Sequence, residues 1–153
     1  MVLKHFLQII LFTFFITQMT LASEKVTAIL NSELNSLTPV KTTESPNKKE
    51  ILLYFWATWC PDCKEKLTSV FKEEKLFAKY NVYLISTDKD LEKVAHFQNK
   101  NSLMPYVYID LKKDLQRKLN IFSVPTIVKL ARTNNEITVL NTQTGGDISD
   151  FIK

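Results

Sequence analysis

The chain has two cysteines, Cys60 and Cys63, and both lie in one Cys-Pro-Asp-Cys segment. An apolar run precedes this segment and a helical pattern follows it, which predicts a turn from a strand into a helix. The N-terminus of a helix has unpaired N–H groups and a partial positive charge, and both stabilise a thiolate, the reacting form of cysteine. We therefore expect Cys60 to be the attacking residue. Cys63, one turn into the helix, is expected to be more buried and to resolve the mixed disulfide.

Two other uses of a Cys-x-x-Cys pair fit this sequence less well. A disulfide across so short a loop constrains the unfolded chain little and contributes about 2 kcal/mol. A structural zinc site needs two further ligands, and the only histidines are His5, near the start, and His96, which we expect at the surface or half-buried. The sequence therefore favours thiol chemistry that uses neither a metal nor another cofactor.

The first 22 residues have the pattern of a secretory signal peptide. Lys4 gives a positive start, an apolar run covers residues 6–16, and small residues precede a cleavage point after Ala22. The alternative is an uncleaved membrane anchor over residues 5–22, although a bilayer span needs about 20 apolar residues. Either way we expect export, to the periplasm of a bacterium, where disulfides persist.

The rest of the chain divides into a helix with a polar linker over residues 23–50 and one domain over residues 51–153. Strands are predicted at residues 51–57, 82–85, 106–109, 126–131 and 137–140. Helices are predicted at residues 61–80, 88–100 and 111–119, and a short one from 147. This order predicts an α/β fold, with parallel strands joined by helices and a C-terminal antiparallel hairpin.

Two local details accompany these helices. Asp88 is expected to cap the helix that ends near Lys100, with Leu91, Val94 and Ala95 facing inward. The pair Gly145-Gly146 is expected either to approach the far rim of the cysteine site or simply to form a turn before the last helix.

Composition argues against a nucleic-acid partner. The formal net charge is +4, and charged residues make up 24% of the chain. Basic and acidic residues alternate, as in Lys64-Glu65-Lys66, which is typical of a solvated mixed-charge surface.

Two segments carry a resemblance to a known family. Residues 55–64, Phe-Trp-Ala-Thr-Trp-Cys-Pro-Asp-Cys-Lys, resemble the active-site segment of thioredoxin-fold proteins, especially the exported TlpA/ResA-like branch. Residues 119–126, Leu-Asn-Ile-Phe-Ser-Val-Pro-Thr, resemble the loop in which a cis-proline faces the cysteine pair. The resemblance covers about residues 51–152 and implies a thioredoxin-like fold, a central mixed sheet flanked by helices.

The resemblance also implies roles for side chains around the cysteines. A cis bond between Val124 and Pro125 would present the Val124 backbone to an extended substrate chain, which can pair with it as an added strand. Trp59 would flank the site, and Thr126 would tune the loop. The expected substrate-binding residues are Trp59, Pro61, Asp62, Val124, Pro125 and Thr126.

The sequence departs from the family pattern at three positions. Tyr54 stands where thioredoxins have a buried aspartate that is thought to move the proton of the buried thiol, and Thr68 replaces a kinking proline. Asp62 lies between the cysteines, and its negative charge is expected to raise the pKa of Cys60 and make the pair more reducing. A lower Cys60 pKa in an Asp62→Asn variant would support this hypothesis, and an unchanged or higher value would reject it.

The function that the resemblance implies is a thiol–disulfide oxidoreductase that reduces disulfides in exported proteins. Its partners would be protein thiols and disulfides, apocytochrome c among them, with electrons from a membrane thiol carrier. Three alternatives stay open: a disulfide oxidase or isomerase, a copper-binding protein, and a non-catalytic thioredoxin-fold protein that binds a partner.

Overall fold

The computed structural model describes residues 50–70, 74–101, 107–133 and 136–151. The predicted signal segment and residues 23–49 of the predicted helix and linker lie outside the described residues, and Glu50 is the first residue of the first strand. Within the described residues, no helix is both long and apolar enough to cross a bilayer.

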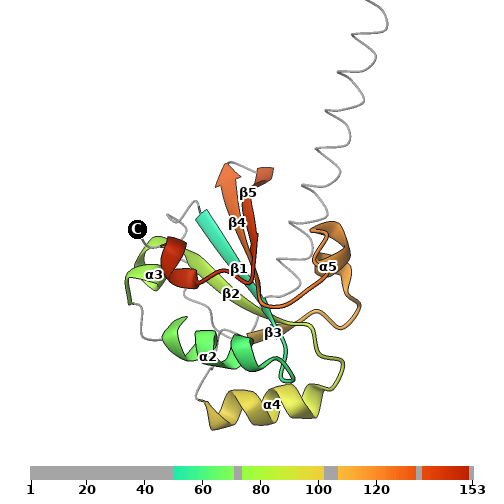
Figure 1. Cartoon of the computed structure of the whole chain (residues 1–153). Coiled ribbons are helices and arrows are strands. Elements are labelled where there is room, and N and C mark those ends of the chain that lie inside the picture. Colours follow the sequence, from blue (N-terminus) through green and yellow to red (C-terminus); the bar gives the residue numbers. More distant parts are fainter. Residues whose placement is uncertain (1–49, 71–73, 102–106, 134–135, 152–153) are drawn as a thin grey trace, which may run out of the picture.

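The domain is built on a mixed five-stranded sheet with the order β3-β2-β1-β4-β5 (Figure 1). Strands β1, β2 and β3 are mutually parallel, whereas β4 pairs antiparallel with β1 and β5 antiparallel with β4. The strands are β1 (Glu50–Trp56), β2 (Asn81–Ser86), β3 (Val107–Ile109), β4 (Thr126–Thr133) and β5 (Glu136–Thr144). The predicted α/β class, with parallel strands and a C-terminal hairpin, is therefore confirmed.

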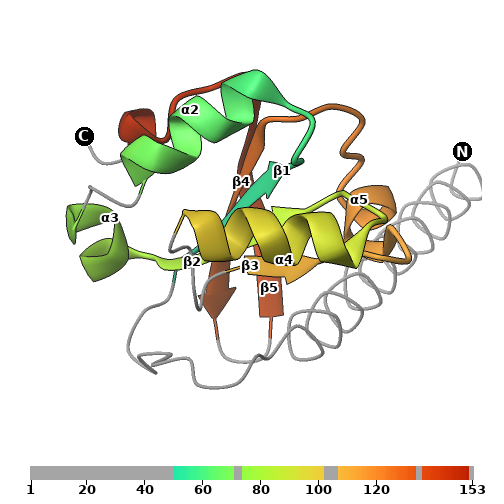
Figure 2. The ribbon, with the colours of Figure 1, turned by 90° about the horizontal axis from the view of Figure 1, so that it is seen from below.

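Helices cover both faces of this sheet. They are α2 (Pro61–Val70), α3 (Glu74–Lys79), α4 (Leu91–Lys100), α5 (Asp114–Lys118) and the 3₁₀ helix η1 (Ile148–Phe151). Because side chains alternate along a strand, β1 contributes to two cores. Leu52, Tyr54 and Trp56 pack with residues of α2, α3, α4 and η1. Ile51, Leu53 and Phe55 pack with residues of α5 and β4 on the other face. Figure 2 shows the arrangement of these helices and strands from below.

The start of α4 corrects one prediction. The N-cap is Asp90, whose side chain accepts hydrogen bonds from the N–H groups of Glu92 and Lys93. Asp88 does not cap this helix, because its carboxylate is engaged with Thr58 and Ser86 instead.

The inward face of α4 also differs from the prediction. Val94 is buried, but Leu91 is 49% exposed and Ala95 is exposed. Phe97 takes the place next to the core, with its ring centroid 5.0 Å from that of Trp56. The helix therefore contacts the core through positions 94 and 97, three residues apart.

The remaining helices are shorter than predicted. Two helices, α2 and α3, lie within the range predicted as one helix over residues 61–80. Helix α5 begins only at Asp114, because the Asp110 carboxylate accepts the N–H groups of Leu115 and Gln116 and so fixes the first turn. Leu111 consequently precedes the helix and is 50% exposed.

Candidate active site at the start of helix α2

Cys60 and Cys63 lie where the central strand β1 passes into α2. The two form a disulfide, with an S–S distance of 2.03 Å and Cα atoms 5.3 Å apart. Both residues are buried, Cys60 with 4% and Cys63 with 0% of its surface exposed. Strand β1 is buried on both faces. Its C-terminal end therefore fixes the point from which the loop to Cys60 begins.

The backbone around Cys60 is arranged to stabilise negative charge on its sulfur. The N–H of Cys63 donates a hydrogen bond of 3.1 Å to Cys60 Sγ. The N–H of Cys60 donates to the carbonyl of Ala57, and its own carbonyl accepts from Lys64 in the first turn of α2. Cys60 therefore occupies the N-terminal end of the helix, where unpaired N–H groups and the helix dipole favour a thiolate.

The loop before β4 faces the disulfide. The Val124–Pro125 bond is cis, as predicted, and the Val124 carbonyl oxygen lies 3.9 Å from Cys60 Sγ. Thr126 is buried, and its hydroxyl donates a 2.7 Å hydrogen bond to the Ser123 carbonyl, which closes the loop. The structure thus brings together two segments that are 64 residues apart in the chain.

The two glycines hold the other side of this loop. The N–H of Gly145 donates to the Pro125 carbonyl at 2.8 Å, and Gly145 has a φ of 69°, a conformation that glycine adopts without steric cost. Lys66 on α2 donates from Nζ to the carbonyls of Gly145 and Gly146, at 2.5 and 3.0 Å. The pair therefore approaches the site, and it also forms the bend between β5 and η1, so both expectations for these glycines hold.

Asp88 is a site residue that the sequence reasoning missed. Its buried carboxylate accepts hydrogen bonds of 2.8 Å each from the Thr58 N–H, the Thr58 hydroxyl and the Ser86 hydroxyl. Thr58 belongs to the loop that leads into Cys60, whereas Asp88 follows β2. The carboxylate therefore fastens the cysteine loop to the neighbouring strand across 30 residues of sequence.

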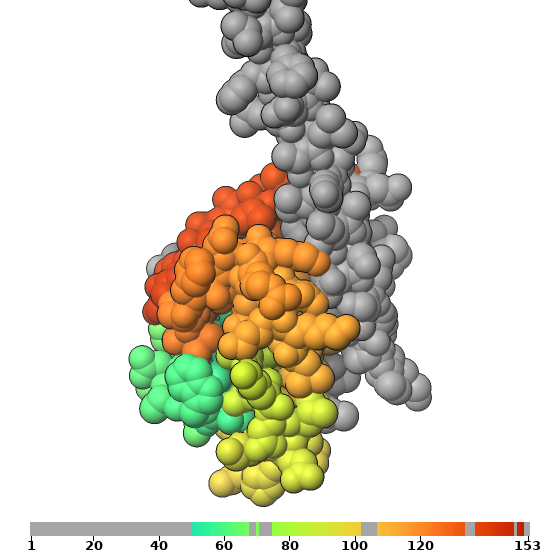
Figure 3. Space-filling view, turned by 90° about the vertical axis from the view of Figure 1, so that its right-hand side faces the viewer, coloured from blue at the N-terminus to red at the C-terminus, as the bar shows by residue number. Residues whose placement is uncertain are grey.

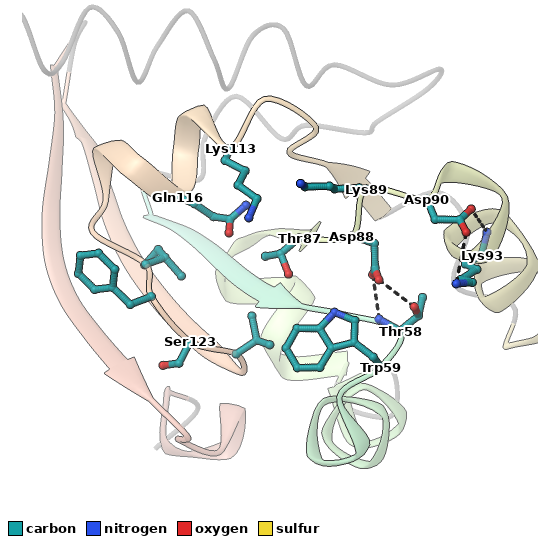
Figure 4. Close-up of a pocket in the computed structure, with 13 residues that line it drawn as sticks. Thr58, Trp59, Thr87, Asp88, Lys89, Asp90, Lys93, Lys113, Gln116 and Ser123 are labelled. Carbon is teal, nitrogen blue, oxygen red and sulfur yellow. Dashed lines mark hydrogen bonds and ion pairs between the residues drawn. The ribbon is translucent and has the colours of Figure 1, made fainter.

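A groove of about 620 Å³ opens beside the cysteine loop. It lies between the Thr58–Trp59 segment, the residues that follow β2, and the segment from α5 to Val124, which meet on the face shown in Figure 3. Trp59 is 69% exposed and Phe122 is 92% exposed, and both line this groove. Figure 4 shows Trp59 and Ser123 on one side of it, opposite Lys113, Gln116 and Lys89.

Comparison with known proteins agrees with this geometry. The family model for the thioredoxin-like domain matches residues 39–144. The chain belongs to the thioredoxin-like family. The family prediction from the cysteine segment and the Pro125 loop is therefore confirmed.

Curated relatives of this thioredoxin-like chain include two from Bacillus subtilis. The thioredoxin-like protein YneN is 33% identical over 82 residues, which is 51% of this chain and 48% of YneN. Sporulation thiol-disulfide oxidoreductase A is 28% identical over 87 residues, 53% of each protein. The chain thus spans about half the length of these relatives.

Solved structures show the same fold. StoA from Bacillus subtilis superposes with a TM-score of 0.54 at 23% identity, over 76% of this chain and 96% of StoA. A putative thiol:disulfide interchange protein DsbE from Chlorobium tepidum has a TM-score of 0.54 at 23% identity, over 67% of this chain and 72% of that protein. The thioredoxin-like fold predicted from the sequence is confirmed.

Tyr54 departs from the thioredoxin pattern and lies under the active site. It is fully buried, and its hydroxyl donates a long hydrogen bond, 3.5 Å, to the Cys63 carbonyl. Burial raises the pKa of the Tyr54 phenol well above its ordinary value near 10, and the negative charges of Asp147 and Asp62 act in the same direction. A phenol is already neutral at physiological pH, and the raised pKa keeps Tyr54 protonated in alkaline solution as well, so Tyr54 acts as a hydrogen-bond donor.

This raised pKa predicts a loss of stability at alkaline pH. The unfolded chain releases the Tyr54 proton near pH 10, but the folded chain retains it, so the free energy of unfolding falls as pH rises above 10. The slope from this group reaches about 1.4 kcal/mol per pH unit. Urea unfolding of wild type and Tyr54→Phe between pH 8 and 11 measures the effect. Above pH 10 the stability of wild type is expected to fall more steeply than that of Tyr54→Phe, and parallel curves would show that Tyr54 ionises as readily in the folded chain as in the unfolded one.

Proposed function

We propose that this chain is a thiol–disulfide oxidoreductase that reduces disulfides in proteins outside the cytoplasm. The observation that carries the proposal is the placement of Cys60. Its sulfur accepts the Cys63 N–H at the start of α2 and lies 3.9 Å from the carbonyl beside the cis-proline. The membership in the thioredoxin-like family and the name of the curated relative sporulation thiol-disulfide oxidoreductase A support the same activity.

The reaction begins from the dithiol form. The Cys60 thiolate attacks one sulfur of a substrate disulfide, and the other substrate sulfur leaves as a thiolate and takes up a proton. Cys63 loses its proton to solvent and attacks Cys60 Sγ, which releases the second substrate sulfur as a thiol. Two electrons have then passed to the substrate, and the enzyme holds the Cys60–Cys63 disulfide seen in the structure.

The residues around the cysteines would hold the substrate for this attack. An extended substrate chain pairs with the backbone of Val124, next to Pro125, and Trp59 packs against it from the groove. Pro61 and Asp62 are exposed on the first turn of α2, and Thr126 keeps the Pro125 loop closed. Cys60 and Cys63 remain the proposed catalytic residues, and the chemistry uses no cofactor.

Export and electron supply complete the proposal. Residues 1–22 act as the export signal or anchor, residues 23–50 connect it to the domain over residues 51–153, and a membrane thiol carrier re-reduces the disulfide. A direct test combines two measurements. Reduction of insulin by the purified chain, driven by dithiothreitol, is expected well above the rate of dithiothreitol alone. Fractionation of an expressing bacterium is expected to place the chain outside the cytoplasm.

The opposite redox direction gives a distinct result. Equilibration of the cysteine pair with a glutathione buffer measures its reduction potential. For a reductase we expect a reduction potential low enough that glutathione leaves the Cys60–Cys63 disulfide largely oxidised. An oxidase or isomerase would instead have a pair that glutathione readily reduces, and that result would contradict the proposed direction.

A further inference from the structure

We propose that the groove beside Trp59 selects substrate segments that carry an acidic side chain near the reacting cysteine. This proposal rests on the function above and names a substrate preference for that same site. The observations behind it are the exposed aromatic side chains of the groove, its lysines, and its position next to Val124.

The aromatic side of the groove is unusually exposed. Among large apolar side chains of the described residues, Phe122 and Trp59 are the most exposed, at 92% and 69%. Both line the groove, together with the half-buried Val124. Apolar surface in contact with water is unfavourable, and burying it against a partner is favourable. Exposed apolar side chains that gather in a concave site therefore indicate a binding surface for a partner.

The opposite side of the groove is basic. Lys89 and Lys113 both line it, and in Figure 4 their side chains extend toward one another above Trp59. Within the part of the chain that the structure describes, neither lysine forms an ion pair. Lys93 also lines the groove, but it pairs with Asp90 at 3.4 Å.

Besides Asp90, the groove is lined by the acidic residue Asp88, which does not form an ion pair with Lys89 or Lys113. Asp88 directs its carboxylate to Thr58 and Ser86, where three hydrogen bonds occupy it. Lys113 is held in place by its own turn, since its N–H donates to the Asp110 carbonyl at 2.9 Å. Two ammonium groups therefore face the groove, that of Lys113 from a hydrogen-bonded turn and that of Lys89 from the residue next to the buried Asp88, and this arrangement suits a carboxylate in a bound chain.

The groove also lies next to the reacting sulfur, where a substrate chain would bind. Val124 lines it and carries the carbonyl that lies 3.9 Å from Cys60 Sγ. A substrate chain that pairs with the Val124 backbone at its cysteine then passes its neighbouring residues along the groove, between Trp59 and the lysines. An aspartate or glutamate within a few residues of the cysteine would meet Lys89 or Lys113.

A matched pair of peptides tests this preference. Each has one cysteine in a mixed disulfide with 2-thiopyridine and carries either glutamate or glutamine at the flanking positions, and thiopyridine release is followed by absorbance. For the reduced wild type we expect kcat/KM to be about three- to fivefold higher for the glutamate peptide, the size of one partly exposed ion pair. The ratio is expected to approach 1 in 0.5 M NaCl, because salt screens such pairs.

Three variants locate the effect. Lys89→Gln combined with Lys113→Gln is expected to bring the ratio of the two peptides to about 1, and Lys113→Arg is expected to retain it. Lys112→Gln is the matched control, since Lys112 is exposed and adjacent in sequence but does not line the groove, and it is expected to keep the wild-type ratio.

The outcomes separate the two proposals. A wild-type ratio of 1, or a ratio that survives in the double variant, overturns the acidic preference and leaves the oxidoreductase activity standing. A chain that releases no thiopyridine from either peptide and does not reduce insulin overturns the proposed function itself.

Discussion

Replacing Cys60 with serine is expected to abolish insulin reduction, lowering the rate by about a thousandfold or more, because the attacking sulfur is lost. Cys63→Ser is expected to lose turnover as well, but for a different reason. Its Cys60 still attacks, and the mixed disulfide with the substrate then persists because no second thiolate resolves it. Mass spectrometry of the trapped species would identify the partner.

The two serine variants control for one another. Each removes the same short disulfide, so both are expected to lose about 2 kcal/mol of stability in the oxidised state, which urea unfolding measures. Only the Cys63→Ser variant is expected to accumulate mixed disulfides. If Cys60→Ser traps partners and Cys63→Ser does not, the roles of the two cysteines are reversed.

Much of this fold could be predicted because its signals are local. The continuous apolar run of β1 indicated a strand buried on both faces, and the residues from 51 to 56 are all buried. The alternation of strands and helices indicated a parallel sheet, and the polar turn near residue 134 indicated the hairpin. The two family segments indicated the cysteine site and the cis-proline loop, although they are separated by about half the domain.

The rest depends on contacts between segments that are distant in sequence. The sequence predicted Asp88 as the cap of α4, but the observed cap is Asp90, two residues further along the chain. Thr58 decides between them, because its N–H and hydroxyl bind the Asp88 carboxylate and leave Asp90 to cap α4. The groove could not be predicted either, since its lysines come from the segment after β2 and from the turn before α5.

The Asp88 contact leads to the second large prediction. Asp88→Ala removes three hydrogen bonds to a buried carboxylate and leaves the Thr58 N–H without its acceptor, so we expect a loss of about 2–4 kcal/mol in the free energy of unfolding. The loop before Cys60 would then be held less firmly. Below the melting temperature of the variant, kcat/KM for disulfide reduction is expected to fall by about tenfold. Urea unfolding and the insulin assay measure the two effects.

Asp110 provides a control, because its carboxylate has almost the same burial and hydrogen bonding as that of Asp88. It is as buried as Asp88, at 7% exposure, it also follows a strand, and its carboxylate accepts hydrogen bonds from the N–H groups of Leu115 and Gln116 and from the Gln116 side chain. Asp110→Ala is expected to lose similar stability. It does not touch the cysteine loop, so it is expected to leave the alkylation rate of Cys60 by iodoacetamide unchanged in a Cys63→Ser background.

The direction of the alkylation rate then identifies what Asp88 does. Removing a negative charge by itself lowers the pKa of a nearby thiol and makes alkylation at pH 7 faster. Loosening the loop instead takes Cys60 away from the Cys63 N–H and the start of α2, which makes alkylation slower, by about threefold for a partial loss of the helix N-terminal effect. Slower alkylation in Asp88→Ala would show that Asp88 positions the loop. A faster or unchanged rate would show that the carboxylate serves stability and local charge alone.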